Sequence, residues 1–435
     1  MGGWTKWILS VGSLVVVAFQ VCTSRLLLVG GGCGWDGAVY CAMFRGEPAP
    51  EPFARRILAP TVARLFAADP VSAFQALDAL TVVLLLIVAA TLVADRGTGA
   101  VVAVCVVVLT TRNLVHFVLI YPVITDPLAL LLLLGGLASL RFDKAWPLLA
   151  LTGALLPLAR ENYGMGLIGA CFALAIIERR KLPLLGVVVT LTSTATGLLT
   201  HHAPGSLRAM LQWFRFSTSS PGNFLRLVVA VVIAVGWSWI VLLAPSIRGR
   251  LGSFERALLI GAGLFGVASI FGGQDTERIL MPVGILLSVV AIRVVQPKLL
   301  AWVAVSYAVV QSPFVVVTPT TEGWLNFFGL RYDGYVEWGR VISVGVAPAL
   351  LGLLVMMIGL LSARRWLPGE TIGVENDLRV VTRHGARGRS VSTSAEGQRY
   401  MLGSRSALER LVDRYQVKTD KAPGIAATTS DHTNN

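Results

Sequence analysis

Charged residues in this chain of 435 residues gather just past the ends of its apolar segments. Asp36 stands in Gly34-Trp35-Asp36-Gly37, directly after the first such segment, where flanking glycines let the backbone turn closely. Arg278 ends Gln274-Asp275-Thr276-Glu277-Arg278, which places two acids and one arginine beside apolar segments. A carboxylate can accept a proton from a hydroxyl group, and a guanidinium can bind a phosphate. We therefore expect Asp36 to be a general base and Arg278 to bind an anionic group.

Three further arginines are candidates for the same anionic group. Arg160 follows an apolar segment, and Arg55 and Arg56 lie in an amphipathic stretch at 53–66 that Pro60 should kink or divide. Each also has a plain structural interpretation. Arg160 would pair with Glu161, Arg278 would pair with Asp275 or Glu277, and the arginines of the stretch would anchor it at a membrane interface.

The other acids in these loops are expected to bind an acceptor or to support the site; they are Asp126, Glu161, Asp275 and Glu277. Asp126 opens an apolar segment in Thr125-Asp126-Pro127, so a helix N-cap is its main alternative role. Asp36, Asp126 and Asp275 together could hold a divalent metal, Mg²⁺ or Mn²⁺, through hard oxygen ligands, although their spacing does not require one. The adjacent His201 and His202 are interpreted as polar loop residues.

Five cysteines are present, and two of them flank Asp36. Cys33 and Cys41 follow the first apolar segment, where an oxidising compartment would permit a disulfide. Two unpaired small residues are the alternative.

Composition predicts a membrane protein. Hydrophobic residues make up 55% of the chain and charged residues only 14%, and several apolar runs reach the roughly 20 residues that cross a bilayer. The net charge of +13 is explained by basic residues at segment ends, so no nucleic-acid partner is expected. Phosphate-binding Gly-rich loops with Lys, CxxC and HExxH patterns do not occur in the sequence, which argues against nucleotide hydrolysis and zinc proteolysis.

We expect an all-α polytopic fold with about 12 transmembrane helices, an external juxtamembrane helix and a flexible cytoplasmic tail. The predicted spans are 8–29, 76–94, 99–119, 127–140, 145–159, 163–177, 183–200, 225–244, 256–272, 279–295, 299–317 and 341–361. Two of them, 127–140 and 145–159, are short for a full crossing, so tilted or broken helices are expected there.

Positive charge follows every even-numbered span, which places both termini in the cytoplasm. The loops 30–75, 201–224 and 318–340 are then external, together with Asp36 and Arg278. Residues 1–362 form the predicted transmembrane catalytic domain, and 363–435 a basic, mostly flexible tail with at most one short amphipathic helix. Arg112, Asn113 and His116 are expected to line a groove or to pair with one another.

The order of these features resembles the GT-C superfamily of membrane glycosyltransferases. The resemblance covers about residues 1–362 as architecture, and its residue-level content is Gly34-Trp35-Asp36-Gly37, Pro52-Phe53 through Arg56 to Pro60, Ala159-Arg160-Glu161 and Asp275-Thr276-Glu277-Arg278. The chain departs from the superfamily in having no large external carbohydrate-binding domain. The sequence also shows no motif that names a branch, so the sugar and the acceptor stay open.

The resemblance implies an inverting sugar transfer from a polyprenyl-phosphate-linked donor to an extracytoplasmic glycan, lipid or protein acceptor. It implies a multi-pass protein of a plasma or inner membrane, bacterial in character, in contact with membrane lipids. Asp36 would act as the base, while Arg278, Arg160, Arg56 or Arg55 would hold the donor phosphate. The alternative is a secondary transporter or flippase of a lipid-linked or anionic substrate, whose ionisable residues should lie nearer the membrane midplane.

Overall fold

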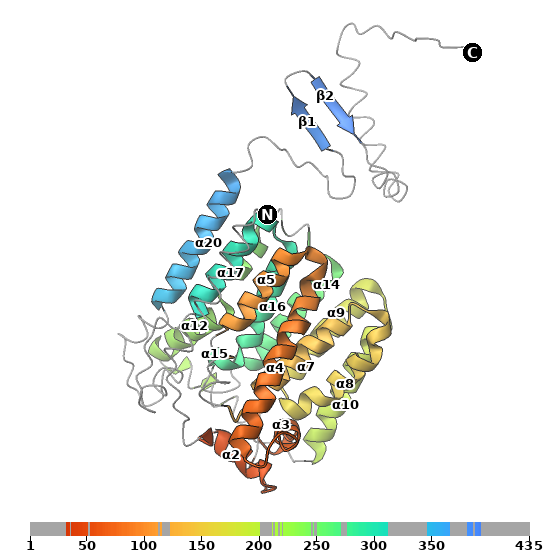
Figure 1. Ribbon diagram of the computed structural model, residues 1–435, viewed down its shortest axis with the longest axis vertical. Helices are drawn as coiled ribbons and strands as arrows, with labels where there is room; N and C mark the ends of the chain where they lie inside the picture. Colours follow the sequence, from red (N-terminus) through yellow and green to blue (C-terminus); the bar gives the residue numbers. More distant parts are fainter. Residues whose placement is uncertain are drawn as a thin grey trace, which may run out of the picture. The chain divides into compact units, whose positions relative to one another are not determined.

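The structure is a computed structural model of the chain (Figure 1). It describes residues 32–34, 36–50, 53–111, 114, 122–200, 211, 214–215, 218–219, 221–244, 247, 250–270, 276–311, 346–365, 381–385 and 388–392. The predicted span 8–29 lies outside these residues, as do Trp35, Asp275 and the pair His201-His202. The chain divides into two compact units, Met1–Arg364 and Arg365–Asn435.

The described residues of the first unit are mostly helical. Its longer helices are α2 (Asp36–Phe44), α4 (Pro70–Val93), α5 (Thr98–Thr110), α7 (Asp126–Ser139), α8 (Trp146–Ala159), α9 (Tyr163–Glu178), α10 (Leu182–Thr200), α12 (Pro221–Val235), α14 (Ser253–Ser269), α16 (Met281–Val294), α17 (Pro297–Gln311) and α20 (Ala347–Arg365). Its short helices are η2 (Phe53–Arg55), α3 (Leu58–Ala63), η3 (Ala94–Arg96), η4 (Asp143–Ala145), η5 (Ser238–Leu243) and α15 (Thr276–Ile279). The prediction of a mostly helical protein is confirmed.

One helix among the described residues, Pro70–Arg96, is long and apolar enough to cross a membrane. The other strongly apolar helices are shorter, at Thr98–Thr110, Asp126–Ser139, Tyr163–Glu178, Leu182–Thr196, Met281–Val294 and Ala347–Ser362. The twelve spans expected from the sequence therefore stay a prediction.

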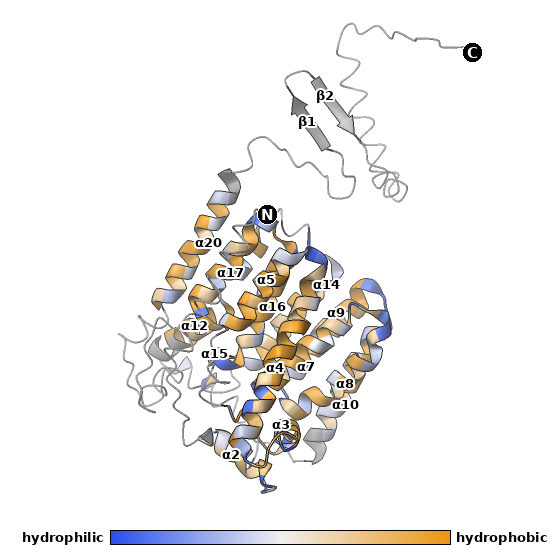
Figure 2. Ribbon diagram, in the orientation of Figure 1, coloured by the Kyte–Doolittle hydropathy of each residue, from blue (hydrophilic) through white to orange (hydrophobic). Residues whose placement is uncertain are grey.

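Helix α4 shows why the sequence folds as it does locally. Asp69 caps its first turn by accepting a hydrogen bond of 2.9 Å from the Ser72 amide, and Pro70 follows as the first helical residue. One face of α4 buries Phe74 and Leu85, while Val83 and Ile87 on the other face are 55% and 56% exposed. Both faces are apolar (Figure 2), a pattern typical of a helix that packs inward on protein and outward on lipid.

Glycine permits the closest helix contacts of this unit. A Cβ on Gly261 of α14 would lie 2.7 Å from the carbonyl oxygen of Gly166 on α9, so a side chain there would push the two helices apart. Small residues at helix crossings have the same role in many membrane bundles.

The predicted span 225–244 is not one continuous helix, and its crossing of a membrane stays a prediction. Helix α12 ends at Val235, Gly236 adopts φ +66°, and the 3-10 helix η5 follows from Ser238. Gly236 can take this left-handed conformation because it has no Cβ. A Cβ on Gly284 of α16 would lie 2.1 Å from the Ala234 carbonyl oxygen, so α16 packs directly on the chain at this break.

The amphipathic stretch 53–66 is also divided, but earlier than Pro60 predicts. It forms η2 and α3, which are separated at Arg56 and Ile57. Pro60 falls in the first turn of α3, where its missing N–H costs no helical hydrogen bond.

Four charged residues connect several helices at one end of the bundle. We call them the Arg293 network: Asp95, Arg141, Glu255 and Arg293. Arg293 donates to Glu255 Oε1 at 2.7 Å and to both carboxylate oxygens of Asp95 at 2.9 and 3.1 Å. Arg141 contacts Asp95 Oδ1 at 2.9 Å. Arg293 also donates to the Leu92 carbonyl and Arg141 to the Thr91 carbonyl, both in the last turn of α4. The network ties the C-terminal ends of α4 and α16 to the start of α14.

The second unit contains a hairpin that the sequence interpretation did not anticipate in the tail. Strands β1 (Val381–Gly385) and β2 (Gly388–Ser392) pair antiparallel, with Val381 opposite Ser392 and Gly385 opposite Gly388. The amphipathic helix expected near Leu408 and Tyr415 lies outside the described residues.

Candidate functional site

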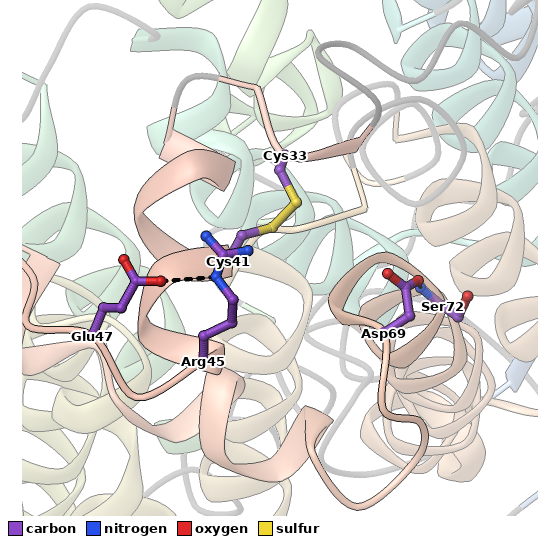
Figure 3. Close-up of a disulfide and its surroundings, with 6 residues drawn as sticks. All are labelled: Cys33, Cys41, Arg45, Glu47, Asp69 and Ser72. Atoms are coloured by element: carbon purple, nitrogen blue, oxygen red, sulfur yellow. Dashed lines mark hydrogen bonds and ion pairs between the residues drawn. A yellow bond between two sulfur atoms is a disulfide. The ribbon is translucent and has the colours of Figure 1, made fainter.

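The segment that carries Asp36 is pinned by a disulfide. Cys33 and Cys41 are bonded, with their Cα atoms 6.0 Å apart (Figure 3). The bond joins the chain ahead of α2 to the middle of that helix, and Asp36 is the first residue of α2. A carboxylate in a first helical turn is stabilised in its ionised form by the peptide dipoles.

Helix α2 is held to α3 by a further arginine. Arg64 donates to the carbonyl oxygens of Phe44 and Met43, both at 2.7 Å, at the C-terminal end of α2. These carbonyls have no partner within the helix, so Arg64 acts as a cap. The contact is structural and does not place Arg64 with the candidate phosphate-binding arginines.

Asp36 contacts Arg278, which lies far away in the sequence. Arg278 Nη2 donates to Asp36 Oδ2 at 3.1 Å, and the two side chains are 8% and 31% exposed, respectively. Burial by itself raises the pKa of Asp36, but Arg278, Arg160 and Arg56 together hold this pKa below its usual range. Asp36 is thus a partly open carboxylate within the field of three arginines.

Arg56 forms the second ion pair. It donates to Glu161 through Nη2 at 2.6 Å and through Nε at 3.0 Å, and through Nη1 to the Tyr40 hydroxyl at 3.3 Å. Tyr40 Oη lies 3.4 Å from Thr125 Oγ1. Although burial raises the pKa of Glu161, the paired Arg56 lowers it to about 2. Arg56 is therefore buried in a specific contact, not exposed at an interface as the anchoring interpretation expected.

The third ion pair corrects two expectations. Arg160 pairs with Asp126, not with Glu161, and both partners are almost fully buried. Asp126 is the first residue of α7 and does not cap it, because its carboxylate accepts from Arg160 and, at 3.5 Å, from the Tyr163 hydroxyl. Arg160 and Glu161 end up with different partners because they follow the end of α8, where the chain leaves the helix.

The six residues of these three pairs form what we call the Asp36 cluster: Asp36, Arg56, Asp126, Arg160, Glu161 and Arg278. They come from α2, the link between η2 and α3, the start of α7, the end of α8 and α15. Arg55 is buried at 6% exposure beside Arg56 in the sequence. Asp275 lies outside the described residues, as does the side chain of Glu277, so their assignments stay predictions.

Sequence reasoning missed one buried acid near the cluster. Asp78 lies within α4 at 1% exposure, close enough to Asp126 for the two carboxylates to interact electrostatically. Among the described residues, neither Asp78 Oδ2 nor Asp126 Oδ2 has a hydrogen-bond partner, and the same holds for Arg160 Nε. Asp78 could have been found from the sequence, because it is an acidic residue inside an apolar run, and such residues mark functional sites in membrane segments.

A divalent metal does not fit the described part of the cluster. The described residues contain no group of three or more His, Cys, Asp or Glu side chains arranged to hold one. Asp36 and Asp126 face different arginines, whose charge opposes that of a metal ion.

No protein-family model matches this chain, and neither a curated protein nor a solved structure matches it. The chemistry of the site therefore rests on its own geometry. A partly exposed carboxylate can accept a proton, and guanidinium groups within reach of one another can bind a phosphate.

Proposed function

We propose that this protein is a membrane glycosyltransferase of the GT-C type. It transfers a sugar from a polyprenyl-phosphate donor to an extracytoplasmic glycan, lipid or protein acceptor, with inversion at the anomeric carbon. The observation that carries the proposal is the contact of Asp36 with Arg278 inside a cluster that also contains Arg160 and Arg56.

In this mechanism Asp36 Oδ accepts the proton of the acceptor hydroxyl. The hydroxyl oxygen bonds to the anomeric carbon as the bond from that carbon to the phosphate oxygen breaks. The electron pair of the broken bond leaves with the phosphate, and the developing charge is neutralised by Arg278, with Arg160 nearby. One carboxylate is enough because the phosphate is a stable leaving anion that needs positive charge more than a proton.

Membrane placement is supported by the apolar outer faces of the helices. Val83 and Ile87 on α4 and Leu350 and Leu354 on α20 are all more than half exposed, which would be costly in water over so many residues. The protein is then a multi-pass component of a plasma or inner membrane. Both termini lie in the cytoplasm and the Asp36 cluster lies at the external surface.

The test is transfer by the full-length protein reconstituted in nanodiscs. Radiolabelled polyprenyl-phosphate sugars are supplied with candidate glycan, lipid and protein acceptors, and label is followed into the acceptor fraction. We expect transfer from at least one donor, with Arg278→Ala weakening donor binding and turnover together because the phosphate loses its partner charge. Absence of transfer from hexosyl and pentosyl donors alike contradicts the proposal.

A proton-coupled transporter or flippase of a lipid-linked or anionic substrate is the second candidate. It is favoured by Asp78, a buried acid within α4 whose Oδ2 has no hydrogen-bond partner in the described part of the chain. Proteoliposomes separate the two functions. A transporter moves labelled lipid across the bilayer without cleaving it and loses this activity in Asp78→Asn, whereas the enzyme cleaves the sugar–phosphate bond.

A further inference from the structure

The three ion pairs of the Asp36 cluster differ in strength. Arg56 holds Glu161 through two hydrogen bonds, at 2.6 and 3.0 Å. Arg160 and Asp126 are both at least 95% buried, so water cannot readily replace either partner. Arg278 Nη2 donates to Asp36 Oδ2 at 3.1 Å, and the Asp36 side chain is 31% exposed. Of the three, the Asp36–Arg278 pair is the easiest to open.

Charge balance adds a second reason for opening. Three arginines and three carboxylates make up the cluster, so its formal charge sums to zero. A phosphate that enters brings negative charge into a site where every arginine already faces a carboxylate. Within the six residues of the cluster, a full guanidinium partner becomes available to the phosphate only when one of these carboxylates is displaced.

Resting on the proposed function, we propose that the donor phosphate displaces Asp36 from Arg278. Asp36 thereby occupies, in the free protein, the position on Arg278 that the phosphate takes in the complex. The displaced carboxylate no longer forms an ion pair with the Arg278 guanidinium. It is therefore more basic than in the free protein, and it is free to move and to accept the proton of the acceptor hydroxyl. Donor binding consequently precedes activation of the base. Until the donor is bound, Asp36 stays paired with Arg278 and does not take a proton from an acceptor hydroxyl.

Competition for Arg278 makes the proposal testable by binding alone, without turnover. The full-length protein is purified in detergent, and the equilibrium binding of a radiolabelled polyprenyl phosphate that carries no sugar is measured. We expect Asp36→Asn to bind this lipid about ten-fold more tightly than the wild-type protein, because a charged hydrogen bond no longer has to be broken. In the double variant Asp36→Asn with Arg278→Gln this gain disappears, since the group competed for is absent.

Asp69→Asn is the matched control. Asp69 precedes α4 and lies outside the cluster, and asparagine caps a helix as well as aspartate does, so this variant removes one negative charge and keeps the fold. We expect its affinity for the lipid to equal that of the wild-type protein. An equal gain in Asp69→Asn would mean that net charge, not release of Arg278, governs affinity, and would overturn the proposal.

Other outcomes are distinguishable. If the wild-type protein binds the lipid and folded Asp36→Asn binds it equally or more weakly, the proposed displacement of Asp36 from Arg278, here called the exchange, is wrong, while the proposed function stands. If the gain in Asp36→Asn is seen only with inorganic phosphate and not with the lipid, the occupant of Arg278 is not a lipid donor and the exchange is again wrong. If the wild-type protein and every variant fail to bind the lipid, the proposed function itself fails and takes the exchange with it.

Discussion

The Asp36 cluster and the Arg293 network use the same residue types at opposite ends of the same helices. Asp78 in α4 and Asp95 in η3, which directly follows α4, are separated by a helical rise of roughly 25 Å. Helix α16 starts just after Arg278 and ends just after Arg293. Among the residues that the structure describes, no buried polar side-chain atom of the Arg293 network lacks a hydrogen-bond partner. At the other end, Asp126 Oδ2, Arg160 Nε and the nearby Asp78 Oδ2 have no such partner in the described part of the chain.

This difference separates a structural ion-pair network from a candidate reaction site. Buried charges that are fully paired hold helices in register, and breaking them is costly. Buried polar atoms left without a partner cost free energy in the absence of a ligand, and such unfavourable arrangements concentrate at functional sites.

Asp36→Asn should lower sugar transfer by about 10²- to 10⁴-fold, because an amide cannot accept the acceptor's proton. The fold should be kept, since asparagine has the same shape and can still accept a hydrogen bond from Arg278. The measurement is the turnover of the reconstituted protein, with the unfolding midpoint measured in parallel. Near wild-type turnover in folded Asp36→Asn would exclude Asp36 as the base.

Arg293→Met should act on stability instead. It leaves Glu255, which is 3% exposed, without its main partner, and removing one member of a buried pair costs about 3 kcal/mol. Denaturant unfolding in detergent measures the change. Arg256→Met is the control, because Arg256 lies next to Glu255 on α14 and is exposed.

If Arg293→Met proves as stable as Arg256→Met, the Arg293 network does not have the structural role assigned to it. Turnover per folded molecule should stay within about two-fold of the wild-type protein in both variants, because neither residue lies at the reacting end.

Loss of the disulfide should have an intermediate effect. With Cys33→Ala and Cys41→Ala combined, the segment before Asp36 is no longer tied to α2, so we expect turnover to fall several-fold while membrane insertion is unchanged. Cys105→Ala is the control because Cys105 is a free cysteine in α5. Equal turnover in the double variant and the control would show that the bond does not position Asp36.

Acid should weaken the fold through Glu161. Its pKa is about 2 in the folded protein against 4.5 for an ordinary glutamate, so the unfolded chain takes up a proton first as pH falls. The stabilisation from Glu161 is complete above about pH 5 and is lost progressively as pH approaches 2. Glu161→Gln should therefore show a flatter decline of the unfolding midpoint between these pH values. A decline of the same steepness would contradict this role for the Arg56–Glu161 pair.

The helices could be predicted from the sequence because their signals are local. Apolar runs marked them, and Asp69 followed by Pro70 marks the start of α4 by capping chemistry. The break at Gly236 was missed because one glycine inside an apolar run carries no sign of its backbone conformation. It is fixed by the close approach of Gly284 on another helix.

The cluster could be predicted only in outline. Asp36 and Arg278 were expected on one side of the bundle as base and anion partner, and the structure places them in contact. The partners of Arg56 and Arg160 could not be predicted, because they are set by long-range packing of η2, α7 and α8. Arg160 and Glu161 are adjacent in the sequence, so an ion pair between them was expected. The chain leaves the helix at the end of α8, and the two side chains pair with Asp126 and Arg56 instead.

The most direct test of the contrast is a side-by-side measurement on Asp36→Asn and Arg293→Met. Both proteins are reconstituted at the same concentration of folded molecules, and each is assayed for transfer of labelled sugar and for its free energy of unfolding. The two variants should show opposite effects. Asp36→Asn should lose turnover and keep its free energy of unfolding, and Arg293→Met should lose free energy of unfolding and keep its turnover. If both variants lose turnover in proportion to their loss of stability, the two ends of the bundle have the same structural role, and the assignment of the reaction to the Asp36 cluster is wrong.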